Sequence, residues 1–108
     1  MIKVRLFKTK TDTVYGFTVK NHSSGIVCAA VSILVQNTIN CIEHFTNDKF
    51  ECDYIETGGF LDFCHPLLKK GGVSKDASLL INAMVFGLYG IKKEYENEID
   101  ITWEVKND

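Results

Sequence analysis

The chain has 108 residues, of which 45% are hydrophobic and 24% are charged, and its formal net charge is -2 at pH 7. This size and composition predict one hydrophobic core and therefore a single domain over residues 1–108. Because basic and acidic residues are mixed, we expect no direct binding of nucleic acid or of anionic membranes. Residues 1–6 alternate charged and apolar side chains, unlike a signal peptide, and no run approaches the ~18 apolar residues of a membrane span. We therefore expect a cytoplasmic protein.

Two segments near the N-terminus alternate apolar and polar side chains. Residues 2–7 place Ile2, Val4 and Leu6 on one side, and residues 13–20 place Tyr15, Phe17 and Val19 on one side. A period of two predicts strands. The polar residues between the segments are few, so the pair is expected to form an antiparallel hairpin.

From Val27 to Phe45 the spacing of the apolar residues changes to that of a helix. Apolar side chains recur at intervals of three and four residues, which predicts one amphipathic helix. Ser23 or Ser24 is expected to cap this helix, with Gly25 easing the turn, so Cys28 belongs to its first turn.

The second half of the chain repeats the pattern of strands followed by a helix. Residues 50–56 and 60–64 alternate around Thr57-Gly58-Gly59, which predicts a second hairpin, and a loop follows through Pro66 and Gly71-Gly72. Ser74 is expected to cap a long helix over residues 75–96, and residues 99–105 form a last strand. The order ββαββαβ predicts an α+β fold with a mainly antiparallel sheet and two long helices.

The second helix is apolar on two faces. Besides its main stripe it carries Leu79, Ala83, Phe86 and Gly90 on another side. A homodimer partner or the first helix of the same chain would cover this second face, and the pattern favours neither. Each of Gly87 and Gly90 weakens a helix by about 1 kcal/mol relative to alanine, which suggests that another element approaches closely.

His22 and Cys28 are the candidate catalytic residues. A cysteine in the first turn of a helix meets unsatisfied backbone amides and the positive end of the helix dipole, both of which favour the nucleophilic thiolate. His22 lies close enough in sequence to act as its base, and the same amides could hold an oxyanion. Ser32 lies one turn further along the helix as a supporting hydroxyl. Because no carboxylate occurs between Val14 and Ile42, Asn21, a backbone carbonyl or a distant residue must orient the imidazole.

The cysteines allow a weaker alternative. Cys28, Cys41, Cys52 and Cys64 contain no C-x-x-C pair, and thiols are the default in a reducing cytosol. A zinc site built from Cys41, His44, Cys64 and His65 is less favoured than buried thiols, so we expect neither a metal nor another cofactor. His44 is expected at a solvated helix end and His65 in the loop before Pro66.

Two segments resemble the ribosomal-processing cysteine protease family Prp. They are His22 with the run Ile26-Val27-Cys28-Ala29-Ala30-Val31-Ser32, and Gly87-Leu88-Tyr89-Gly90-Ile91-Lys92-Lys93-Glu94-Tyr95. The resemblance covers nearly the whole chain. It implies a small cytoplasmic homodimeric endopeptidase that removes an N-terminal extension from a large-subunit ribosomal protein precursor, cutting after an aromatic-containing stretch. Cys28 is then the nucleophile, His22 the general base, and Ser32 matches a serine of the motif.

The sequence departs from the family pattern around the dyad. Asn21-His22-Ser23 stands where the family usually has Gly-His-Ala, the loop between His22 and Cys28 is shorter than in many members, and Gly25 replaces an aspartate. A non-catalytic ribosome-assembly or binding factor on the same fold is therefore the alternative. A thiol-dependent redox or metal protein ranks third, because it needs a second cysteine near Cys28 or a bound metal.

Overall fold

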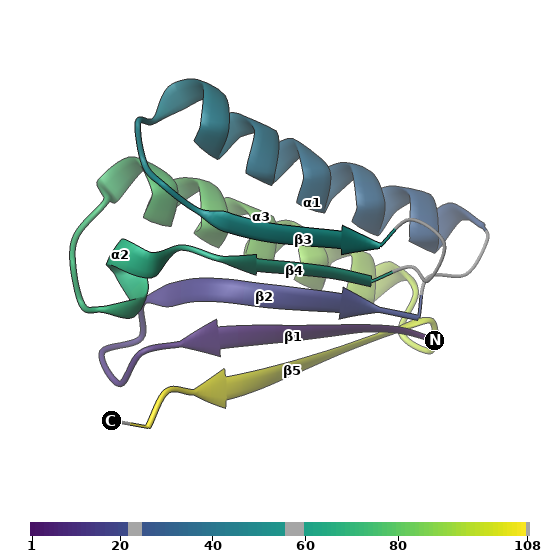
Figure 1. Ribbon diagram of the computed structural model, residues 1–108. Coiled ribbons are helices and arrows are strands. Elements are labelled where there is room, and N and C mark those ends of the chain that lie inside the picture. The colour runs from purple at the N-terminus through teal and green to yellow at the C-terminus, as the bar shows by residue number, and fades with distance from the viewer. Residues whose placement is uncertain (22–24, 56–59, 108) are drawn as a thin grey trace.

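The computed structural model describes residues 1–21, 25–55 and 60–107 (Figure 1). The elements in chain order are β1 (Ile2–Lys8), β2 (Val14–Lys20), α1 (Ile26–Phe45), β3 (Glu51–Ile55), β4 (Phe60–Cys64), α2 (Pro66–Lys69), α3 (Lys75–Glu94) and β5 (Ile99–Val105). The expected α+β class and the order ββαββαβ are confirmed. The short helix α2 is an addition, because its four residues were expected to form a loop.

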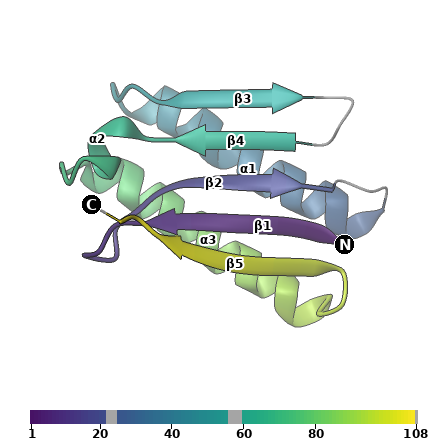
Figure 2. The same cartoon turned by 60° about the horizontal axis from the view of Figure 1, so that its bottom comes forward.

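The five strands form one sheet in the order β3-β4-β2-β1-β5. Both expected hairpins, β1–β2 and β3–β4, are antiparallel, and so is the β2–β4 pair, whereas β1 and β5 are parallel. The turn expected at Thr57-Gly58-Gly59 lies outside the described residues. Helices α1 and α3 both cover the same face of the sheet, and Figure 2 shows the other face turned toward the viewer.

The strand alternation sorts the side chains onto the two faces. Leu6 pairs with Phe17 and Phe17 with Phe63, so these apolar residues line up on the helix side. The rings of Phe17 and Phe63 stack with centroids 5.0 Å apart, and both are buried. On the open face the register aligns Arg5 with Thr18 and Thr18 with Asp62. The core therefore lies between the sheet and the two helices.

Helices α1 and α3 pack closely at Gly87. A Cβ atom on Gly87 would lie 2.9 Å from Leu34 Cδ2, so this glycine lets α1 approach α3, as expected from the sequence. The same expectation is wrong for Gly90, where a Cβ would meet no described atom within 4 Å.

The second apolar face of α3 stays exposed. Leu79 is 69% exposed and Phe86 is 84% exposed, and Ala83 and Gly90 are exposed as well. Among the described residues α1 therefore does not cover this face, which removes one of the two alternatives considered from the sequence. The opposite side of α3 faces the core, and its buried residues are Ala77, Ile81, Met84 and Leu88.

Helix α1 is more apolar than we expected for a segment of this chain. Its 20 residues are long and apolar enough to cross a membrane by length and composition, with a mean hydropathy of 1.5 over 18 residues. This corrects the expectation that no segment approaches a membrane span. The core helix of a soluble protein passes the same test, and α1 buries residues that include Val31, Val35 and Ile42 in the core.

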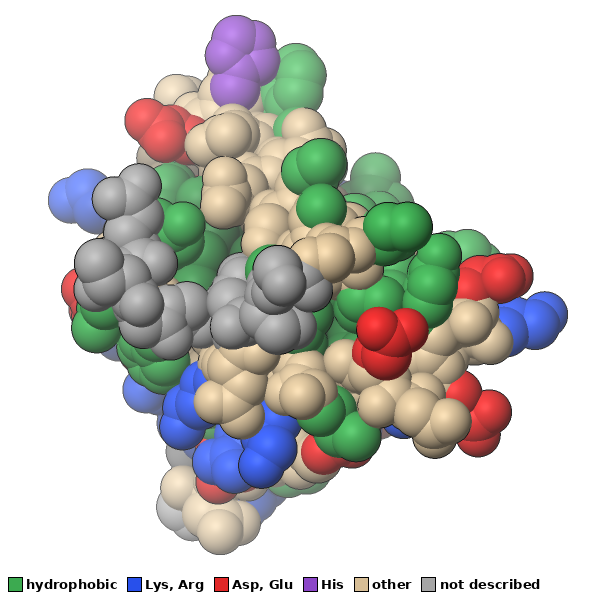
Figure 3. Space-filling model, turned by 90° about the vertical axis from the view of Figure 1, so that its right-hand side faces the viewer, with side chains coloured by type: hydrophobic (Ala, Val, Ile, Leu, Met, Phe, Trp, Pro, Cys, Tyr) green, Lys and Arg blue, Asp and Glu red, His purple; other side chains and the backbone are tan. Residues whose placement is uncertain are grey.

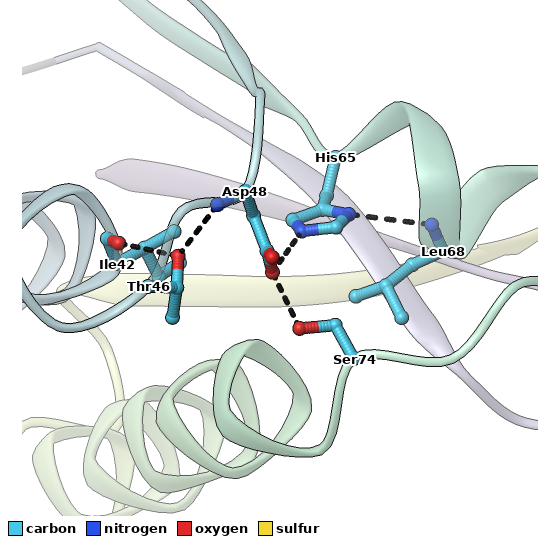
Figure 4. A network of polar contacts seen from close by, with 6 residues as sticks. All are labelled: Ile42, Thr46, Asp48, His65, Leu68 and Ser74. Carbon is cyan, nitrogen blue, oxygen red and sulfur yellow. Dashed lines mark hydrogen bonds and ion pairs between the residues drawn. The ribbon is translucent and has the colours of Figure 1, made fainter.

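A polar network joins three connections at the far end of the fold (Figure 4). His65 was expected in the loop before Pro66; it stands directly before Pro66 as the N-cap residue of α2, and its side chain is completely buried. Its Nδ1 accepts a hydrogen bond from the Leu68 backbone N–H at 3.2 Å. The ring proton therefore sits on Nε2, which donates to Asp48 Oδ2 at 2.9 Å. The imidazole thus both caps the start of α2 and contacts a carboxylate.

Ser74 completes the network from the start of α3. It is the N-cap residue, as expected, but its side chain makes no capping hydrogen bond. Instead its hydroxyl donates to Asp48 Oδ2. Asp48 thus ties the α1–β3 connection to His65 at the end of β4 and to Ser74 before α3, and we call Asp48, His65 and Ser74 the polar clasp.

The clasp makes stability depend on pH. Hydrogen bonds from Ser74 and then from His65 lower the pKa of Asp48 below its ordinary value of 3.8. A folded-state pKa below the unfolded one means that the carboxylate stabilises the fold above that range, and that this contribution is lost as pH falls through the folded pKa. We expect the difference in unfolding free energy between the parent and Asp48→Asn, measured by urea titration, to be largest near neutral pH and to shrink below about pH 4. A difference that stays constant down to the acid limit would contradict this.

Candidate active site at the start of helix α1

Cys28 lies in the first turn of α1, where the sequence predicted it. The helix begins at Ile26 and its first intrahelical hydrogen bond runs from the Ala29 N–H to the Gly25 carbonyl, at 3.1 Å. The N–H groups of residues 26–28 therefore precede the helical hydrogen-bond ladder, and no acidic residue stands in the first turn. Cys28 is partly exposed and packs against the core. The positive end of the helix dipole lies at this position.

Gly25 is the N-cap residue, in place of the expected Ser23 or Ser24. Its φ of 113° lies in the region that favours glycine, and glycine itself offers no capping side chain. Ser23 and Ser24 lie outside the described residues. Amides at the start of a helix can receive an anion, which is the chemistry that an oxyanion site requires.

His22 lies outside the described residues, so its geometry relative to Cys28 stays a prediction. Its neighbour Asn21 is described: this residue follows β2, is exposed and has a φ of 61°. Asparagine tolerates this left-handed conformation better than most residues. The chain therefore turns sharply immediately before His22. The expected role of Asn21 as an orienter of the imidazole is not tested.

Ser32 is placed beside Cys28 by the helix itself. Residues four apart lie one above the other on a helix, and Ser32 is partly buried. The same interval continues to Gln36 and Asn40, which are exposed. The structure thus extends the Cys28–Ser32 pair into a polar stripe along α1, which the sequence analysis missed. The spacing of four residues was the available signal, but it was hidden by the stronger apolar pattern.

The other cysteines differ from Cys28 in their surroundings. All four cysteines are thiols. Partial desolvation, followed by the charges of Asp53 and Asp62, raises the pKa of Cys52. Burial also raises the pKa of Cys64. Both thiols are therefore held in the less reactive, protonated form.

The zinc alternative finds no support in the described part of the chain. There, no group of three or more His, Cys, Asp or Glu side chains could hold a metal ion. His44 lies exposed in the last turn of α1, as expected, while His65 belongs to the polar clasp.

A basic surface and an apolar surface lie at the end of the molecule that carries the start of α1. Figure 3 views this end: a group of lysine and arginine side chains lies below the grey residues, and hydrophobic side chains gather on the helix side. Lys3, Arg5 and Lys20 line a groove on the open sheet face that also includes Asn21. The candidate site therefore adjoins both a basic and an apolar surface.

The mixed five-stranded sheet with two long helices on one face defines a small α+β protein, and a cysteine thiol lies in the first turn of α1. The chain belongs to the family described as cysteine protease Prp, whose model matches residues 1–100. A curated relative, the ribosomal processing cysteine protease Prp of Bacillus subtilis (strain 168), is 26% identical over 84 residues, which make up 78% of this chain and 75% of the relative. The resemblance noted in the sequence is thereby confirmed.

Solved structures share the fold. The essential ribosomal processing protease Prp from S. aureus in complex with a covalently linked product peptide has a TM-score of 0.87 at 22% identity, covering 96% of this chain and 100% of that chain. The same S. aureus protease in complex with a substrate peptide has a TM-score of 0.85 at 20% identity, with the same coverage. SMU.848 from Streptococcus mutans has a TM-score of 0.79 at 21% identity, covering 98% of this chain and 96% of that chain.

Proposed function

We propose that this protein is a cysteine endopeptidase that removes the N-terminal extension of a large-subunit ribosomal protein precursor. The observation that carries the proposal is the position of Cys28 at the start of α1, in a chain that belongs to the Prp family. The relative named as a ribosomal processing cysteine protease supports the substrate class. We propose that the protein acts on this precursor in the cytoplasm.

In the proposed mechanism Cys28 attacks the scissile carbonyl carbon as a thiolate. His22 accepts the thiol proton and later gives it to the leaving amine, which releases the C-terminal product. The amides at the start of α1 stabilise the oxyanion of the tetrahedral intermediate. Water then hydrolyses the acyl-enzyme, which frees the extension as a carboxylate and restores the thiol. Ser32 and Asn21 are proposed as supporting residues.

Mass spectrometry of a synthetic peptide that spans the extension and the mature N-terminus tests the activity. We expect a single cut that is blocked after iodoacetamide modifies Cys28. The alternative, a non-catalytic assembly or binding factor, is suggested by the short loop before Cys28 and by Gly25 at the position of the family's aspartate. This alternative predicts binding of the precursor without any cut.

The exposed apolar face of α3 supports a homodimer. Leu79 and Phe86 on α3 and Ile33 on α1 are each at least 69% exposed. Large apolar side chains that gather on one surface mark protein contact sites, and two-fold dimers are the commonest assembly. We expect the parent to sediment as a dimer and the double variant Leu79→Asp, Phe86→Glu to sediment as a folded monomer. A parent that is monomeric at all concentrations would refute the dimer.

A further inference from the structure

A groove runs between α1 and the edge strand β3 and leads toward Cys28. One part has a volume of about 310 Å³ and is lined by Gln36, Ile39, Asn40, Cys52, Tyr54 and Leu61. Beyond Gln36 and Tyr54 a further space of only about 10 Å³ reaches Ser32. Because Ser32 lies one helical turn from Cys28, the groove points to the candidate nucleophile. Figure 1 shows the C-terminal end of β3 directed toward the start of α1.

The groove has a polar wall and an apolar floor. The amides of Gln36 and Asn40 form a polar side, whereas Val31, Val35 and Leu61 lie deeper and are buried. A hollow with an apolar floor and a few polar groups at its rim accepts apolar side chains and orients them by hydrogen bonds.

Strand β3 offers hydrogen bonds along the same path. It is the last strand of the sheet, every one of its residues is exposed, and in the described part of the chain only β4 pairs with it. Tyr54 and Ile55, at the end near the start of α1, are 51% and 52% exposed. An open edge of this kind pairs with extended peptides.

Negative charge gathers on the open-face side of this edge. Asp53 on β3 lies directly opposite Asp62 on β4, and Glu51 is two residues from Asp53. Burial, then Asp53 and Glu51, raise the pKa of Asp62, while Lys69 acts in the opposite direction. Like charges directly opposite each other in a sheet are unfavourable, and a basic side chain beside them relieves the repulsion.

We propose that the peptide substrate binds as a sixth strand along the outer edge of β3, with apolar side chains in the groove under α1 and basic side chains beside Asp53 and Asp62. The proposal rests on the proposed function only in naming the bound peptide as the substrate. The rise from Cys28 to Asn40 along α1 is about 18 Å, which corresponds to about five extended residues. The groove thus recognises a stretch of alternating apolar and basic residues on one side of the scissile bond.

A fluorescent peptide of alternating leucine and lysine tests the geometry in the Cys28→Ala variant, in which binding is not obscured by cleavage. In an extended peptide, residues whose side chains share one face also direct their backbone N–H groups to one edge. N-methylation of every leucine and N-methylation of every lysine must therefore have different effects. We expect one modified peptide to bind about tenfold more weakly and the other to bind almost as well as the parent peptide. Equal effects of the two modifications would overturn the sixth strand.

A charge reversal tests binding at the β3 edge. Asp53→Lys should weaken the leucine–lysine peptide about fivefold and strengthen a leucine–glutamate peptide. Glu94→Lys at the exposed C-terminal end of α3 is the matched control: it makes the same change in net charge and should leave both affinities unaltered. The rate at which iodoacetamide modifies Cys28 should be the same in both variants. Equal effects of the two reversals would refute binding at β3.

The outcomes separate this inference from the proposed function. If the parent cuts the precursor peptide but the two N-methylated peptides bind alike, the protein is a protease and the sixth strand is wrong. If the N-methylated peptides differ and Asp53→Lys reverses the charge preference, yet no peptide is cut, the edge site stands and the catalytic proposal fails.

Discussion

Replacing Cys28 with alanine should lower kcat/KM for the precursor peptide by at least about a thousandfold, because no other atom can form the acyl-enzyme. Cys41→Ala is the matched control, since Cys41 lies on the same helix and is partly buried, but four turns from the helix start. We expect this control to cut at the parent rate. Continuous fluorescence from a quenched peptide measures both variants, and circular dichroism verifies that each is folded.

His22→Ala extends the same experiment. Loss of a general base costs about a hundredfold to ten-thousandfold, so we expect a large but smaller loss than for Cys28→Ala. His44→Ala removes an exposed imidazole at the far end of α1 and should leave the rate unchanged. If Cys28→Ala or His22→Ala cuts as fast as the parent, the assignment of the dyad is wrong.

The fold was predictable where one periodicity dominates a long segment. The alternation of β1 and the helical spacing from Val27 to Phe45 each bury one apolar face, so local pattern and tertiary packing agree. Strand β2 lies in the middle of the sheet and is buried along most of its length. Helix α2 was missed because four residues are too few to show a helical period, and Pro66 at its start looked like a loop signal.

The candidate site was predictable only in part, because its components depend on different ranges of sequence. Cys28 is positioned by its own helix, so a local pattern located it. The edge groove is built from α1, β3 and β4, and Tyr54 gives no local sign that it lies beside Gln36. The polar clasp has the same origin: Asp48 lies 17 residues from His65 and 26 residues from Ser74 along the chain, and only the sheet order brings the three together.

Replacing His65 with alanine should lower the free energy of unfolding by about 3 kcal/mol. The variant leaves the Leu68 N–H without its side-chain acceptor and removes a donor from Asp48, and each buried group left unsatisfied costs about 1–3 kcal/mol. The removed ring also leaves a cavity, since the side chain is completely buried. Urea unfolding followed by circular dichroism measures the change.

Two further variants distinguish the capping role of His65 from its contact with Asp48. His44→Ala, at an exposed position, should change the free energy of unfolding by less than about 0.5 kcal/mol. His65→Asn retains a side-chain acceptor of the type preferred at an N-cap but is too short to replace the imidazole between Leu68 and Asp48, so it should fall between alanine and the parent. If His65→Ala is as stable as His44→Ala, the clasp does not stabilise the fold.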